Sequence, residues 1–337
     1  MLSIRPLSRR EVLRVAGVAA MASLVQPLPA VSGVLDRLLG SALEAKPTPP
    51  ITPNEEFYIT SYRSPPSVRL ENWQLFVKGL VERPMTLTYA DLLARPRVAE
   101  IVTLECVGNT VGGEFISTAA WEGVPLRQLL EDVRVSPSAF DVVFRAADGY
   151  SDSIRIERAM AGDVLVAYRM NGVPLPQAHG FPARIIVPGI YGMKSVQWLT
   201  DIEVVDFDYQ GYYQKKGWSD DATVKTMSRI DVPGHGAVLQ GRRQIVQGLA
   251  FAGTRGIRQV EVSTDGGGTW APAKLDVPLS PYAWVFWSYE WAVATIGRHS
   301  LAVRATDGLG KLQTSFEQDP APDGASGLHQ ITVTVET

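Results

Sequence analysis

The sequence predicts two domains of different class, an α+β domain followed by an immunoglobulin-like β-sandwich. Two patterns favour this division. Strand-like and short helical runs are mixed along residues 57–218, whereas residues 219–337 carry regularly spaced alternating runs with turn residues between them. We assign residues 1–31 to a targeting segment. Residues 32–56, with a central part rich in proline and small residues, are expected to be a linker.

The targeting segment has the composition of an export signal. Arg9 and Arg10 precede an uncharged stretch at residues 15–25, and prolines and small residues follow at residues 27–32. The apolar stretch is well short of the roughly 20 residues that a membrane-spanning helix needs. The paired arginines resemble a twin-arginine signal, which predicts a periplasmic protein. The alternative is that the two arginines begin an ordinary amphipathic helix.

The elements expected in the first domain are short. Residues 73–79 alternate apolar and polar side chains as a half-buried strand does, and Thr88 is placed to cap a helix that begins near Tyr89. Residues 142–144 and 184–187 are apolar runs that predict strands with buried faces. Asp-Gly or Pro-Gly follows each of them, which is typical of a turn.

The second domain is predicted from alternating strands. Residues 257–263 alternate, an Asp-Gly-Gly-Gly turn follows, and a returning strand begins near residue 270. Further strands are expected at residues 244–248, 284–291, 300–306 and 330–335, with spacings typical of an antiparallel sandwich. The sequence leaves open whether the tryptophans of this domain pack in its core or line an edge of a site in the first domain. They are Trp270, Trp284, Trp287 and Trp291.

Composition excludes several classes of function. Lysine and arginine number 32 against 35 acidic residues and are dispersed along the chain, so nucleic acid is not an expected partner. Four histidines and one cysteine provide no paired spacing for a zinc finger or zinc ribbon. Neither a P-loop nor a GxGxxG following a strand is present. A bound metal would therefore need most of its ligands from outside the chain.

Cys106 is the only cysteine, so it cannot form an internal disulfide. It lies where an apolar run gives way to a glycine-rich, uncharged loop. A free thiol is most commonly a small buried hydrophobe. The alternative is a thiolate kept for chemistry, as a nucleophile or as a soft metal ligand. Position alone does not decide between the two readings.

Five segments, taken in order and spacing, resemble successive signatures of the sulfite oxidase family. They are residues 105–109 (ECVGN), 121–126 (WEGVPL), 167–176 (AYRMNGVPLP), 179–184 (HGFPAR) and 187–196 (VPGIYGMKSV). The C-terminal part, with VSTDGG at residues 262–267, looks like the molybdenum-cofactor dimerisation domain of that family. The resemblance covers nearly all of the chain after the targeting segment.

The resemblance implies a Mo-molybdopterin cofactor, with Cys106 as the protein ligand to molybdenum. A thiolate is a suitable soft donor, and coordination to a high-valent metal keeps it deprotonated. Tyr150 falls where the family keeps a tyrosine beside the metal, and a phenol there can donate a hydrogen bond and orient the substrate. The remaining cofactor-binding residues that the resemblance implies are Tyr58, Ile59, Thr60, His179, Arg184, Gly192, Met193, Lys194 and Ser195.

The sequence also departs from the family pattern. Sulfite oxidases carry Arg-Asn-His where this chain has Thr60-Ser61-Tyr62, and an arginine of the family can stand where this chain has Val285. A dianionic substrate needs nearby cations, which these neutral side chains do not supply. Two substrate classes therefore compete: a sulfite-like oxyanion that is oxidised, and an S-oxide or N-oxide that is reduced. The missing cations favour the neutral substrate.

We therefore expect a periplasmic oxidoreductase that transfers an oxygen atom to or from a small molecule in a two-electron reaction. Because no Cys-x-x-Cys-His haem attachment motif is present, electrons are expected to be exchanged with another protein, either a c-type cytochrome or a membrane haem protein. Family likeness also implies a homodimer formed through the C-terminal domain. The alternative from another class is a cofactor-free binding or assembly module that uses the tryptophan-rich face around Trp284 and Trp287.

Overall fold

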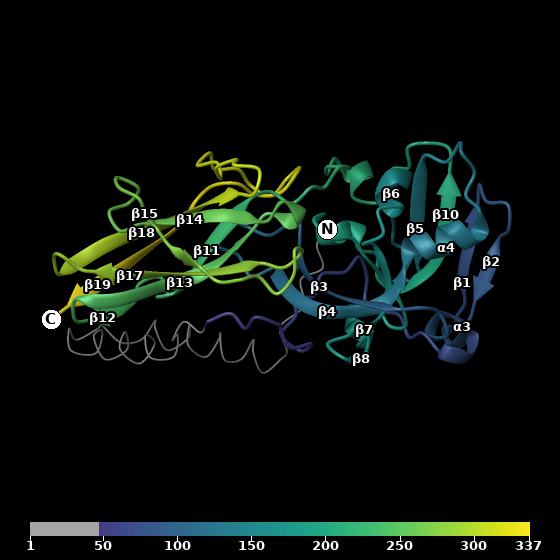
Figure 1. Ribbon diagram of the computed structural model, residues 1–337, viewed down its shortest axis with the longest axis horizontal. Helices are drawn as coiled ribbons and strands as arrows, with labels where there is room; N and C mark the ends of the chain where they lie inside the picture. The colour runs from purple at the N-terminus through teal and green to yellow at the C-terminus, as the bar shows by residue number, and fades with distance from the viewer. Residues whose placement is uncertain (1–46) are drawn as a thin grey trace, which may run out of the picture.

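The structure, a computed structural model, describes residues 47–337. The predicted targeting segment and most of the predicted linker lie outside this range. Figure 1 shows two sheet-rich units arranged end to end along the long axis of the molecule. The described α-helices are few and short: α3 (Tyr89–Leu93), α4 (Leu126–Val133) and α5 (Ile156–Ala159). None of the helices in residues 47–337 is long and apolar enough to cross a membrane.

The first unit contains two five-stranded sheets. In sheet order, one consists of β2 (Met85–Leu87), β1 (Leu75–Gly79), β10 (Leu199–Val205), β5 (Asp141–Ala146) and β6 (Ser151–Arg155). Within it, β1 and β10 pair in parallel and the other neighbours pair antiparallel. The other sheet consists of β3 (Val98–Glu105), β4 (Ile116–Pro125), β7 (Leu165–Met170) and β8 (Val173–Pro174), with β9 (Arg184–Ile186) also paired to β7.

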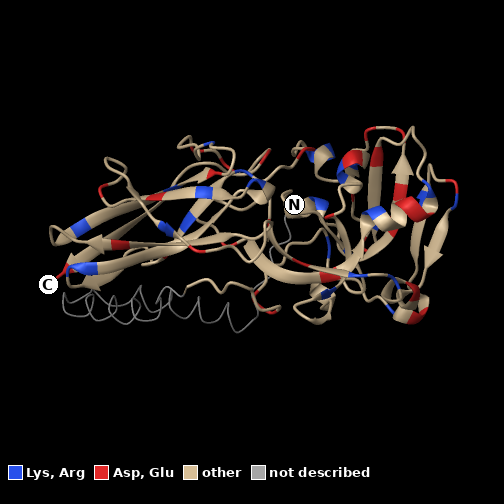
Figure 2. Cartoon of the chain, in the orientation of Figure 1, with Lys and Arg blue, Asp and Glu red and all other residues tan. Residues whose placement is uncertain are grey.

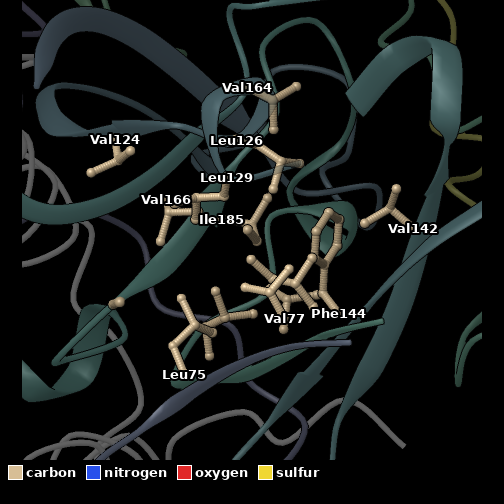
Figure 3. Close-up of a cluster of buried hydrophobic side chains, with 14 of the residues drawn as sticks. Leu75, Val77, Val124, Leu126, Leu129, Val142, Phe144, Val164, Val166 and Ile185 are labelled. Atoms are coloured by element: carbon tan, nitrogen blue, oxygen red, sulfur yellow. The ribbon is translucent and has the colours of Figure 1, made fainter. Parts of the chain in front are cut away.

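A shared hydrophobic core joins these two sheets. Figure 3 shows Leu75 and Val77 of β1 and Phe144 of β5 close to Val166 of β7 and Ile185 of β9. All five side chains are fully buried, and burying each such side chain contributes roughly 1.5–3 kcal/mol. The packing fixes the position of one sheet on the other. Segments distant in the sequence are thereby brought together at the strand ends.

The short helices follow their local sequence signals. Thr88 caps α3 as predicted, because its hydroxyl accepts from the backbone N–H of Asp91 while the Asp91 carboxylate accepts from the N–H of Thr88. Helix α4 packs an apolar face into the core of the first unit. The side chains on that face are Leu126, Leu129, Leu130 and Val133.

The second unit consists of two facing sheets. One has the order β11 (Met227–Val232), β13 (Arg243–Phe251), β17 (Val285–Ala292) and β16 (Lys274–Leu275). The other has the order β12 (Val238–Gln240), β19 (His329–Glu336), β18 (Gly297–Asp307), β14 (Ile257–Ser263) and β15 (Ala271–Pro272). Both sheets contribute side chains to one hydrophobic core. Each strand predicted for this unit has a counterpart in the structure. Figure 2 shows acidic and basic residues interspersed along both units.

The structure decides the position of the tryptophans. Trp284, Trp287 and Trp291 are between 2% and 5% exposed and belong to hydrophobic clusters. Trp270 is partly exposed, and the Arg304 guanidinium lies 4.2 Å above its ring. The tryptophan-rich face that a binding module would use is therefore buried, because the indoles of Trp284 and Trp287 point into the protein interior.

The two units are in direct contact. The backbone N–H of Trp284 donates to Oγ1 of Thr103 in β3 (2.9 Å), and the indole of Trp284 donates to the carbonyl of Pro50 (3.2 Å). From β11, Arg229 Nη1 donates to the Gly113 carbonyl in the loop between β3 and β4 (2.7 Å). The second unit thus contacts the loop that carries Cys106.

Candidate active site

Cys106 directly follows β3, where the strand passes into a loop that returns to β4. Its backbone N–H donates to the carbonyl of Phe115 (2.9 Å), which closes the base of this loop. The thiol is only 8% exposed, and its Sγ accepts a hydrogen bond from the backbone N–H of Gly108 (3.4 Å). Burial raises the pKa of the Cys106 thiol, against the opposing effect of hydrogen bonds from Gly108 and Thr60. A bound cation would be needed to hold it as a thiolate at neutral pH.

A buried asparagine holds the loop after Cys106 in shape. Asn109 Nδ2 donates to Glu105 Oε1 (3.0 Å), and Asn109 Oδ1 accepts from the backbone N–H of Phe115 (3.0 Å). Burial raises the pKa of Glu105 to about 7. The loop also needs a glycine at position 112, where φ is +71° and a Cβ atom would lie 2.4 Å from the ring of His329.

A cleft with about 750 Å³ of empty space, part of it open to solvent, lies beside the Cys106 thiol. Most of the residues predicted to form the site line this cleft, although they come from separate parts of the chain. They are Tyr58, Thr60, Cys106, Tyr150, Arg184, Gly192, Met193 and Ser195. These residues come from the segment before β1, the loop after β3, the turn before β6, strand β9 and the region around the 3-10 turn at Gly192–Lys194.

Arg184 supplies a buried positive charge to the cleft. It is 4% exposed and donates from Nη1 to the carbonyl of His179 and from Nη2 to the carbonyl of Ser195, both at 3.1 Å. Its Nε has no partner, and none of the carboxylates in residues 47–337 forms an ion pair with it. Burial lowers the pKa of Arg184 to about 10, so the group remains a cation at neutral pH. A buried cation without a counter-charge is costly, which suits it to an anionic ligand.

Three of the predicted residues do not line the cleft. Ile59 is about half exposed. His179 is buried beside Arg184, and its Nε2 lies 2.7 Å from the carbonyl oxygen of Asn54. Its Nδ1 has no hydrogen-bond partner within residues 47–337. Lys194, in the 3-10 turn η3 (Gly192–Lys194), directs its ammonium group at two carboxylates, as described further below.

Tyr150 lines the cleft with a hydroxyl that is already hydrogen-bonded. It follows the turn at Asp148 and Gly149, and its Oη lies 2.8 Å from Asp152 Oδ2 and 3.0 Å from the carbonyl oxygen of Met193. Burial and the nearby Asp152 carboxylate raise the pKa of the phenol well above its ordinary value. The phenol is therefore neutral at physiological pH, and its hydroxyl donates a hydrogen bond to Asp152 Oδ2 or to the Met193 carbonyl.

The lining of the cleft includes residues that the sequence did not point to. Tyr213 and Trp218 line it, and burial together with the neighbouring Cys106 raises the pKa of Tyr213 to about 12. Asp148 also lines it, and burial raises the pKa of that carboxyl group. No local sequence pattern marks Tyr213 as a cleft residue. It reaches the cleft only because the segment that follows β10 folds back against the first unit. The exposed Arg63 guanidinium lies 4.9 Å from the ring centre of Tyr62, which lines the cleft.

Known families match both units. Residues 62–213 match the oxidoreductase molybdopterin binding domain, and residues 219–318 match the Mo-co oxidoreductase dimerisation domain. The chain is 32% identical to NADH nitrate reductase 1 of Oryza sativa subsp. japonica over 321 residues, covering 76% of this chain and 35% of the relative. It is also 32% identical to mitochondrial sulfite oxidase of Mus musculus over 287 residues, covering 71% of this chain and 53% of that protein. The chain thus spans about a third to a half of the length of these relatives.

A solved structure shares the fold across nearly the whole chain. The sulfane dehydrogenase SoxCD from Paracoccus pantotrophus superimposes with a TM-score of 0.72 at 22% sequence identity, covering 94% of each chain. Together the matches define a molybdopterin-binding oxidoreductase domain joined to a Mo-co dimerisation domain, so the cofactor is Mo-molybdopterin. The two domain matches in this order, and the likeness to sulfite oxidase and nitrate reductase, which are enzymes, support the assignment of this chain to the sulfite oxidase family.

Proposed function

We propose that this chain catalyses two-electron oxygen-atom transfer at a molybdenum cofactor that Cys106 ligates. One observation carries the proposal. The only thiol of the chain and the buried guanidinium of Arg184, which has no carboxylate partner among residues 47–337, line the same cleft. A soft donor and a fixed cation in one cavity fit a metal held by a dithiolene whose far end carries a phosphate.

The other residues of the cleft fit the same group. Gly108 and Gly192 both line the cleft. Gly192 lets Tyr58 pack closely beside it, because a Cβ at position 192 would lie 2.6 Å from Tyr58 Oη. When bound, the molybdenum centre supplies the two-electron redox change. The chain contributes the Cys106 ligand, an anion site at Arg184, and a wall of aromatic side chains that restricts water around the reacting atoms.

We propose a neutral S-oxide or N-oxide as the substrate. Thr60 and Tyr62 line the cleft without positive charge, and Asp148 places a carboxyl group on the same surface. Both features disfavour a dianion. Oxidation of sulfite is the second candidate, supported by the exposed cation of Arg63 beside Tyr62 and by the likeness to mouse sulfite oxidase.

Further proposals concern the whole protein. Twin-arginine export and a periplasmic location are supported by the sequence of residues 1–31. An external haem protein would exchange electrons with the cofactor, and the dimerisation-domain match supports a homodimer through the C-terminal unit. The immunoglobulin-like class of this unit, with a boundary near residue 219, is supported by its two facing sheets.

Elemental analysis and pterin fluorescence of protein recovered from a host that makes the cofactor test this proposal. We expect near one molybdenum and one pterin per chain, and altered molybdenum spectra in Cys106→Ser. Well-folded protein without metal or pterin would instead favour a cofactor-free binding module.

Two assays separate the substrate candidates. One supplies sulfite with a cytochrome acceptor, and the other supplies a sulfoxide with a reduced viologen donor. We expect turnover in the second assay. Turnover of sulfite alone would overturn the neutral-substrate proposal, and inactivity of molybdenum-loaded protein in both assays would exclude both classes.

A further inference from the structure

A chain of buried polar groups leads away from Tyr150. Its hydroxyl contacts Asp152 Oδ2 at 2.8 Å, and Asp152 Oδ1 lies 2.9 Å from Lys194 Nζ. Lys194 Nζ also donates to Asp220 Oδ1 at 2.7 Å. The side chains of Asp152 and Lys194 are almost completely buried, whereas that of Asp220 is 39% exposed. Four groups that exchange protons with oxygen or nitrogen acceptors are therefore linked without a break.

The two ends of this row of polar groups line different cavities. Tyr150 lines the candidate active-site cleft. Lys194 and Asp220 line a second cavity, with about 980 Å³ of empty space partly open to solvent, on the side of Arg155 and Thr223. The buried pair of Asp152 and Lys194 thus separates the active-site cleft from an independent opening to solvent.

The cost of burying these charges calls for a reason. Moving a carboxylate and an ammonium group out of water is expensive, and apolar residues of similar size would often stabilise a fold as well. A phenol, a carboxyl group and an amine are also the side chains that can each accept and release a proton. A purely structural network would have no need to connect two cavities.

We propose that Tyr150, Asp152, Lys194 and Asp220 form a proton path between the active-site cleft and solvent in the second cavity. The proposal rests on the proposed function, because oxygen-atom transfer coupled to electron exchange moves two protons. Reduction of a sulfoxide takes up two electrons and two protons and yields one sulfide and one water molecule. Oxidation of a sulfite-like anion consumes one water molecule and releases two protons with two electrons. Either direction needs a route for protons that does not require the cleft to fill with water.

Each pass along the path leaves the side chains as they began. For uptake, Tyr150 gives its hydroxyl proton to an acceptor in the cleft. Lys194 Nζ then protonates the Asp152 carboxylate, and Asp152 passes that proton to the Tyr150 oxygen and is a carboxylate again. The Lys194 amine regains its proton from solvent through Asp220. For release, the same steps run in reverse, and one proton crosses per pass.

The first test measures proton exchange in the full chain as isolated, and does not depend on bound cofactor. With tyrosine labelled with carbon-13 at Cζ, the isotope shift on transfer to heavy water gives the exchange rate of the Tyr150 hydroxyl, assigned with Tyr150→Phe. We expect Asp220→Asn to slow this exchange about tenfold or more, since it removes the group that links Lys194 to solvent. Asp221→Asn is the matched control, because Asp221 is an exposed neighbour that bonds Thr223 instead. Equal rates in wild type and Asp220→Asn would overturn the path.

The second test uses molybdenum-loaded protein. We expect Asp220→Asn to lower kcat about tenfold with KM unchanged, to raise the solvent isotope effect, and to be rescued in part by a small external acid such as imidazolium. Asp152→Asn, if it folds, should also lower kcat and raise the solvent isotope effect. If it does not fold, Asp220→Asn alone carries the test. Loaded, active Asp220→Asn with normal kcat would also count against the path. Protein without molybdenum would refute the proposed function but leave the exchange result standing.

Discussion

Arg229 of the second unit donates a hydrogen bond from Nη1 to the carbonyl oxygen of Gly113, 2.7 Å away in the loop that carries Cys106. The same guanidinium pairs with Asp231 through Nε (2.6 Å) and donates from Nη2 to Thr48 Oγ1 (2.9 Å). The conformation of the candidate metal-binding loop therefore depends on a buried residue of the other domain. The C-terminal unit therefore contacts the loop beside the cleft, in addition to the dimer surface that we expect it to provide.

Replacing Arg229 with methionine should destabilise the protein and reduce its cofactor content. The change leaves Asp231 buried without its partner, and breaking a buried pair in this way costs about 3 kcal/mol. Thermal unfolding and molybdenum content measure the two effects. Arg258→Met, at an exposed position in β14, should stay within about 0.5 kcal/mol of wild type. Wild-type stability in Arg229→Met would show that the contact does not hold the loop.

Replacing Arg184 with methionine should weaken retention of the cofactor. A hydrogen bond to a charged group is worth about 1.5–3 kcal/mol, which corresponds to about 10-fold to 100-fold in affinity. Arg184→Lys keeps the charge but loses the planar fork, so we expect an intermediate loss. Pterin fluorescence after acid release measures the bound fraction. Arg145→Met is the control, because Arg145 pairs with Glu203 outside the cleft; an equal loss there would contradict a specific role for Arg184.

Acidification should destabilise the fold through His329. Its Nδ1 accepts from the backbone N–H of Ile230 (3.0 Å), and burial lowers the pKa of the imidazole to about 4. Because the unfolded chain binds this proton near pH 6.5, the unfolded state holds more protons between about pH 6.5 and 4. The stability contributed by neutral His329 is therefore complete above pH 6.5 and is lost as the pH falls towards 4. The full loss is about 3 kcal/mol.

Urea unfolding of wild type and His329→Gln at pH 7.5 and pH 5 measures this contribution. Only wild type should lose the His329 part of its stability on acidification. Comparing the two proteins cancels the opposite contribution of Glu105, whose raised pKa of about 7 stabilises the fold as the pH falls. Parallel pH dependence of the two proteins would contradict the prediction.

An alanine at position 112 should cost more than an alanine at a comparable open position. Gly112 has φ of +71°, and its Cβ would approach the His329 ring to 2.4 Å. Gly162 has φ of +89° but nothing within 4 Å of an added Cβ. Gly162→Ala should cost about 1–2 kcal/mol from backbone strain alone, and Gly112→Ala should cost about 1–3 kcal/mol more because of overpacking. Equal losses of unfolding free energy in Gly112→Ala and Gly162→Ala would show that the His329 ring moves aside at no cost.

Local patterns predicted much of the fold. Residues 257–263 coincide with β14, and Thr88 caps α3 as expected. The long hairpin of β3 and β4 was not selected, although it carries Cys106. Its register depends on pairing with β7 and on contacts with the second unit, which no local window contains.

The sequence by itself determined the class of the protein. Five ordered segments, one of which contains the single cysteine at position 106, carry the resemblance that implies the cofactor, because a resemblance needs only residue identity and spacing. Ligation of molybdenum by Cys106 stays a prediction. Tertiary structure alone decided where the side chains point. It directs Lys194 at Asp152 and Asp220, adds Tyr213 and Asp148 to the cleft, and buries Trp284. Such directions follow from packing and charge pairing between residues far apart in the chain, which short-range sequence patterns do not encode.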